Sequence, residues 1–205
     1  MQIRCVEVAG RNISALKRFY SETLELAITD ESNDRFSVQA GASILTFTDS
    51  PDVTGVYHIA FNIPEDWFDE GVEWLRARTE ILRGTNGSDI FPATSWNAHA
   101  VYFADPEDNI LELIARHDLP STSTQFEILS ISEVGVAVDD VATEAARLGL
   151  PDYKGHTDEF RPVGDEEGLL ILVKKGRLWW PTENQPAAAL PTDLTLSTGQ
   201  LHYPR

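Results

Sequence analysis

The chain has 205 residues, of which 42% are hydrophobic and 9% aromatic, a composition typical of a globular protein with an apolar core. Sixteen lysines and arginines stand against 33 aspartates and glutamates, which gives a formal net charge of −17. This balance argues against nucleic-acid and membrane partners, because phosphate backbones and anionic lipid surfaces bind clustered basic residues. The single cysteine, Cys5, excludes an intrachain disulfide, and no apolar stretch approaches the roughly 20 residues of a membrane helix. We therefore expect a cytoplasmic protein.

A strand followed by a helix is predicted three times along the chain. In each copy, branched or aromatic residues alternate with small or polar ones, which predicts a strand with one packed face and one open face. The helical segments carry apolar stripes that suit the packed face. Cys5, His58 and Glu133 hold equivalent places in the three strands. The copies occupy residues 3–24, 56–78 and 131–149.

Further strands are predicted after each helix, so a βαβββ unit recurs about three times in an α+β fold. Residues 117–127 are rich in Ser, Thr and Pro and are the predicted linker. The expected organisation is a first unit at 1–52, a second at 55–116, the linker at 117–127, a third unit at 128–178 and an extended tail at 179–205.

The segment at 101–115 reads VYFADPEDNILELIA, an aromatic strand, a turn with Asp and Pro, and a strand containing Glu112. With the Phe19-Tyr20 pair and the sequence His-Ile-Ala-Phe from His58, it resembles the vicinal-oxygen-chelate superfamily of glyoxalases, bleomycin-resistance proteins and extradiol ring-cleaving dioxygenases. The turn departs from the family at Asp108, which stands where glycine is usual. The resemblance implies that residues 1–116 form two units paired into a cup, with the third unit beside them.

The resemblance also implies metal ligands at four positions in the cup: Cys5, about Thr46, His58 and Glu112. His58 and Glu112 are typical ligands of Fe, Mn, Zn or Ni, and Cys5 would be the third ligand as a thiolate. Structural alternatives remain at each place. Cys5 could be a small buried hydrophobe, His58 a core histidine, and Glu112 one side of an ion pair or hydrogen bond across the cup.

Tyr102 stands ten residues before Glu112, and the resemblance implies that it is a catalytic hydrogen-bond donor or acid. If residues 105–109 form a hairpin tip, the two side chains share a face. An ordinary strand tyrosine is the alternative. By the same alternation His99 faces the other side of the sheet and is not expected to act as a base.

The expected function is that of a divalent-metal-dependent enzyme, a dioxygenase or a glyoxalase-like lyase, acting on a small substrate with vicinal oxygens. The alternative is a metal-free small-molecule-binding protein of the bleomycin-resistance type. An unpaired third unit would need a cover, either the tail with Trp179 and Trp180 or a second copy of the chain in a homodimer. Glu133 falls in this third unit, which is expected to be metal-free.

Overall fold

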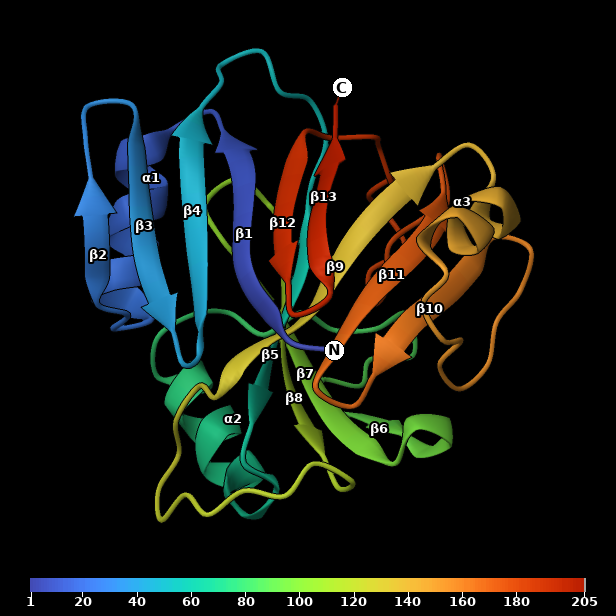
Figure 1. Ribbon diagram of the computed structural model, residues 1–205. Coiled ribbons are helices and arrows are strands. Elements are labelled where there is room, and N and C mark those ends of the chain that lie inside the picture. The colour runs from blue at the N-terminus through green and yellow to red at the C-terminus, as the bar shows by residue number, and fades with distance from the viewer. Residues whose placement is uncertain (205) are drawn as a thin grey trace.

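The computed structural model describes residues 1–204, and Figure 1 shows three units and a C-terminal hairpin joined in one continuous sheet. The first unit has β1 (Ile3–Gly10), α1 (Ile13–Arg18) with a π-turn (Phe19–Thr23), β2 (Ile28–Glu31), β3 (Arg35–Ala40) and β4 (Ser43–Asp49). The second has β5 (His58–Ile63), a 3-10 turn (Glu65–Trp67), α2 (Phe68–Arg76), β6 (Phe91–Ala93), a 3-10 turn (Thr94–Trp96), β7 (Ala98–Ala104) and β8 (Ile110–Arg116). The third has β9 (Ser130–Val138), α3 (Val141–Leu148), β10 (Phe160–Asp165) and β11 (Gly168–Lys174), and β12 (Thr192–Leu196) and β13 (Gly199–Tyr203) follow. The predicted α+β fold of repeated units is confirmed.

Two units are less regular than the βαβββ pattern. In the third unit two strands follow the helix, and a single bridge from Asp152 to Val163 stands in place of a further strand. In the second unit the stretch predicted as a strand near residues 81–90 contributes one bridge, Ile81 to Phe103, and the strand itself is β6. Residues 117–129, which contain the predicted linker, hold no helix or strand.

The alternation of side chains gives the sheet its two faces. Val6 of β1, Phe61 of β5 and Val134 of β9 are fully buried on the side that the helices cover. Leu16 of α1 and Val72 of α2 join the same apolar cluster. Burying such side chains is the main stabilising contribution in a fold of this kind. On β5 and β9 the other face carries smaller or polar residues, among them His58, Ala60 and Glu133, and this is the face of the cavity described below.

The units are not paired as the sequence analysis expected. In the sheet, β5 lies antiparallel to β9 and parallel to β8, while β9 lies parallel to β11. The second unit therefore joins the third, and β9 separates β1 from β5. The expected cup between residues 1–52 and 55–116 is corrected to one between the second and third units. Because the three first strands alternate alike, their sequences do not say which two will pair.

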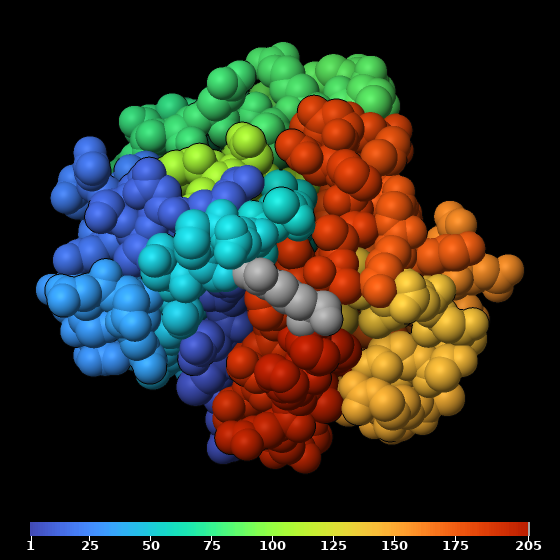
Figure 2. All heavy atoms as spheres, turned by 90° about the horizontal axis from the view of Figure 1, so that it is seen from above, coloured from blue at the N-terminus to red at the C-terminus, as the bar shows by residue number. Residues whose placement is uncertain are grey.

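The C-terminal tail is not extended but forms a hairpin that completes the sheet at the first unit. Strand β12 pairs antiparallel with β1 and with β13. Figure 2 shows this hairpin, in red, between the first unit in blue and the third in gold. The unit that needs a cover is thus the first, and its edge is covered by the tail. Trp179 is 4% exposed and Trp180 40% exposed, so only the second indole reaches solvent.

The β7–β8 hairpin turn ties the second unit to the first. Asp108 has φ of 64°, the conformation for which glycine is usual, as the sequence suggested. The Glu107 carboxylate accepts hydrogen bonds from the backbone N–H groups of Arg11 and Asn12 at the start of α1, at 2.7 and 2.5 Å. Asp105 accepts a hydrogen bond from the hydroxyl of Tyr20, at 3.1 Å. Within residues 1–204, no helix is long and apolar enough to cross a bilayer.

Candidate metal centre

Three strands bring one histidine and two glutamates together on the concave face. The centre of the arrangement is Ala60 of β5, which lies opposite Glu112 of the parallel strand β8 and opposite Glu133 of the antiparallel strand β9. His58 stands two residues before Ala60 and therefore shares its face. The small side chain at Ala60 leaves the space into which the three longer side chains converge.

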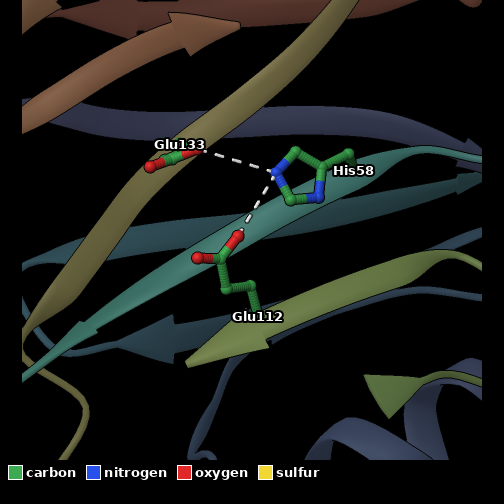
Figure 3. A group of neighbouring side chains, drawn as sticks. All are labelled: His58, Glu112 and Glu133. Carbon is green, nitrogen blue, oxygen red and sulfur yellow. Dashed lines mark ion pairs between the residues drawn. The ribbon is translucent and has the colours of Figure 1, made fainter. Parts of the chain in front are cut away.

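The three side chains are close enough to share one ion. His58 Nε2 lies 3.6 Å from Glu112 Oε2 and 3.7 Å from Glu133 Oε2, as Figure 3 shows. One ligand atom from each residue lies within 4.8 Å of the other two. His58 is 6% exposed and each glutamate 3% exposed, so all three side chains are buried.

His58 and Glu133 each have partners that orient them. His58 Nδ1 lies 3.2 Å from the carbonyl oxygen of Ile110. If this nitrogen donates, Nε2 carries the lone pair that faces the glutamates. The ring of Trp179 packs over His58, with centroids 5.5 Å apart. Glu133 uses its other oxygen, Oε1, to pair with Nη2 of Arg116.

Tyr102 lies directly opposite Glu112 on β7, as the ten-residue spacing predicted. Burial, followed by the charges of Glu112 and Glu133, raises the pKa of Tyr102 well above its ordinary value. The phenol is therefore protonated at neutral pH and can donate a hydrogen bond. Burial also raises the pKa of Glu112 well above its ordinary value, and the charge of Glu133 raises it further, while Arg116 and the hydrogen bond to Tyr102 lower it. Burial and the neighbouring carboxylate thus outweigh the effect of the one guanidinium beside the group, that of Arg116.

This donor set fits a divalent metal ion. Ligand atoms about 2.1 Å from one ion stand roughly 3.0–3.4 Å apart in octahedral or tetrahedral geometry, so the distances at His58 need only small adjustments. An imidazole nitrogen and two carboxylates suit Fe, Mn, Zn or Ni. A divalent cation would also offset the two buried negative charges of Glu112 and Glu133, of which only Glu133 has a buried guanidinium beside it. The fourth position of the pseudo-symmetric set is Ile171, which pairs with Gly135 on β11 and supplies no ligand atom.

A buried network connects Glu133 to the surface. Arg116, at the end of β8, donates from Nε to Ser132 Oγ at 3.2 Å and from Nη1 to the Tyr153 hydroxyl at 3.1 Å. That hydroxyl donates to Glu166 at 2.6 Å, and Glu166 also accepts from Lys154 at 2.9 Å. Arg116 is 1% exposed, so its charge is held in place by these neighbours.

The residues predicted from the sequence are only partly brought together. His58, Glu112 and Tyr102 lie on one side of one cavity of about 250 Å³. Cys5 does not join them, because β1 is not the neighbour of β5, and its side chain lines a separate hollow with Thr46. His99 packs on Phe68, on the helix side as expected, with ring centroids 5.6 Å apart.

Glu133 and Arg116 were missed as site residues. Glu133 holds the place in the third repeat that His58 holds in the second. This equivalence would have identified Glu133 if the sequence analysis had paired the second unit with the third, as the structure does. Arg116 gave no comparable signal in the sequence. The third unit was expected to be metal-free, whereas the structure places its Glu133 in the candidate metal group.

Comparisons with known proteins agree with this fold. A "putative dioxygenase" from Bacillus subtilis superposes with a TM-score of 0.63 at 16% sequence identity, over 84% of this chain and 63% of the other. A mutant of glyoxalase I from Zea mays superposes with a TM-score of 0.58 at 15% identity, over 84% of this chain and 68% of the other. The chain thus spans less than two thirds of the length of the Bacillus protein. No protein-family model and no curated protein sequence matches the chain.

The protein has the vicinal-oxygen-chelate fold, with a candidate metal group on the concave face of its second and third units. At these identities the similarity extends to the fold alone. The activity must be argued from the site.

Proposed function

We propose that the protein is a divalent-metal-dependent enzyme acting on a small substrate with vicinal oxygens, in which His58, Glu112 and Glu133 hold the metal. The observation that supports this most is the convergence of these three buried side chains within 4.8 Å at one cavity. A buried carboxylate that is neither paired with a cation nor bound to a metal destabilises the fold. Three protein ligands are also the number that leaves coordination positions open in catalytic sites.

When bound, the metal would act as a Lewis acid on the adjacent oxygens of the substrate. The protein's own residues would supply the other parts. Tyr102, protonated and beside Glu112, would donate a hydrogen bond to a substrate oxygen that gains negative charge. Trp179 would exclude water from the imidazole face of His58. These roles fit a dioxygenase or a glyoxalase-like lyase equally.

Metal content is the direct test of the proposal. Protein purified without chelator is expected to hold one transition-metal ion per chain by elemental analysis. Glu112→Gln, which keeps the shape of the side chain and removes its charge, and His58→Ala should each remove this ion. Zinc titration by calorimetry should show one site in the wild type and none of comparable affinity in the two variants.

Cys5→Ser is the matched control, because Cys5 was the ligand that the sequence suggested and it lies in another hollow. This variant should bind zinc as the wild type does. Circular dichroism should show that all variants are folded. Wild-type protein that binds no zinc, manganese, iron or nickel would refute the proposal and favour a metal-free binding protein.

A further inference from the structure

The cavity above the candidate metal group has flat aromatic walls. Trp96 and Phe160 stand on one side with ring centroids 6.3 Å apart, and Trp179 and Trp180 also line the space. Its volume of about 250 Å³ lies just below the roughly 300–1,000 Å³ typical of sites for drug-sized ligands. These dimensions suit a small, flat molecule with a single ring.

One cation, Arg177, lines this cavity together with His58 and Glu112. Its guanidinium lies 5.1 Å from the ring centroid of Phe160, and Nη1 donates to the carbonyl oxygen of Leu178 at 3.1 Å. Most lysines and arginines of this acidic chain are ion-paired, but within residues 1–204 no carboxylate lies within 4.0 Å of Arg177. The remaining N–H groups of its planar fork are suited to a carboxylate.

A second donor belongs to Trp179, one of the residues that line this cavity. The indole N–H of Trp179 is buried and has no hydrogen-bond partner among the described residues. A buried donor of this kind is costly unless an oxygen of water or a ligand accepts from it. The cavity therefore combines apolar walls with donors for an oxygen-rich ligand.

The sum of charges points to an anionic substrate. With a divalent ion in place, its two positive charges and those of Arg116 and Arg177 stand against the two negative charges of Glu112 and Glu133. The excess is two positive charges, which suits a ligand with one carboxylate and one ionised oxygen of a vicinal pair. Since the whole chain carries a formal charge of −17, a local cation is needed to hold such an anion.

We propose that Arg177 binds the carboxylate of a small aromatic acid whose vicinal oxygens face the metal group of His58, Glu112 and Glu133. This inference rests on the metal-dependent function proposed above and adds the class of substrate. Trp96, Phe160 and Trp179 hold the ring, and Arg177 selects the acid over neutral molecules of the same shape.

The test compares two probes that differ only in charge, 3,4-dihydroxybenzoate and 3,4-dihydroxybenzamide. Both are titrated by calorimetry into the zinc-loaded protein at pH 7. Zinc is used because it supports no redox chemistry, so the probes bind without being converted. We expect the wild type to prefer the benzoate by roughly ten-fold or more, the effect of one charge-assisted bidentate contact. In Arg177→Gln the two probes should bind within about two-fold of each other, with the benzamide affinity unchanged.

Arg18→Gln is the matched control, since it removes the same charge from an exposed position on α1. It should keep the preference of the wild type. An undiminished preference in Arg177→Gln, or no binding of the benzoate to the zinc-loaded wild type, would overturn the inference. Zinc stoichiometry, measured on the same samples, separates this result from failure of the metal site, which would appear as loss of zinc in the wild type.

Discussion

The buried ion pair of Arg116 and Glu133 allows a quantitative prediction about the floor of the site. Both residues are almost inaccessible, at 1% and 3% exposure. Arg116→Met keeps an apolar stem of similar length but leaves the buried Glu133 carboxylate near Glu112 and without its ion-pair partner. Breaking one side of a buried pair typically costs about 3–5 kcal/mol. We expect the free energy of unfolding of the metal-free protein to fall by about this amount.

Urea unfolding followed by tryptophan fluorescence, with chelator present at pH 7, measures this loss. The control is Arg161→Met, because Arg161 makes a similar pair with Asp152, at 2.6 Å, on the surface. Those side chains are 25% and 41% exposed, so their ion pair should contribute far less to stability than the buried pair. The double variant Arg116→Met with Glu133→Gln should recover part of the loss, since no uncompensated charge then remains at Glu133.

Two results would refute this reasoning. One is a loss in Arg116→Met no larger than that in Arg161→Met, which would mean that the buried pair contributes no more to stability than the surface pair. The other is a double variant whose loss equals the sum of the losses measured for Arg116→Met alone and for Glu133→Gln alone. That result would mean that the two side chains are not coupled.

Three further predictions concern single positions. Burial raises the pKa of Asp105 to about 6; the folded state therefore holds its proton more tightly than the unfolded state, and the free energy of unfolding of the wild type relative to Asp105→Asn should fall by about 3 kcal/mol as the pH rises from below 4 to above 6 in urea titrations. A pH-independent difference would contradict this. Asp108→Gly should raise the free energy of unfolding by about 1 kcal/mol, because φ is 64° there, and a loss would contradict this. Gly135→Ala would place a Cβ 2.5 Å from Trp179 Cη2 and 3.0 Å from His58 Cβ; zinc affinity should fall about ten-fold in calorimetry, and unchanged affinity would show that the ring moves freely.

The sequence was sufficient for those features that depend on neighbouring residues. Alternation along the strands gave the face that packs under the helices, and Val6, Phe61 and Val134 indeed share one apolar cluster with helix residues. The spacing of Tyr102 and Glu112 gave their cross-strand pairing, because a short turn sets the register of a hairpin.

The features that depend on contacts between distant segments were not readable. Three similar first strands allow several pairings, and the sequence does not show which edges meet. Pairing the first unit with the second led to the prediction of Cys5 as the third ligand. In the structure, β9 lies beside β5 and brings Glu133 next to His58 instead. Arg116 ends a strand and would ordinarily be read as a solvent-facing charge, and only the third unit covering it makes it a buried partner of Glu133.

The first unit repeats the strand pairing of the candidate metal group with other residue types at the equivalent positions. On β1, Glu7 lies opposite Thr46 of the parallel strand β4 and opposite Asp193 of the antiparallel strand β12, as Ala60 lies opposite Glu112 and Glu133.

Cys5 stands two residues before Glu7, in the place that His58 holds before Ala60. The C-terminal hairpin thus takes the position of a partner unit, and β1 has paired neighbours on both sides. Yet Thr46 stands in the place of a carboxylate, and Glu7 fills the central position that Ala60 leaves open, with Glu7 accepting a hydrogen bond from Thr48 at 3.0 Å. The pairing of the strands supplies the positions, and the residue types at those positions decide that, within residues 1–204, the candidate metal ligands come together between the second and third units.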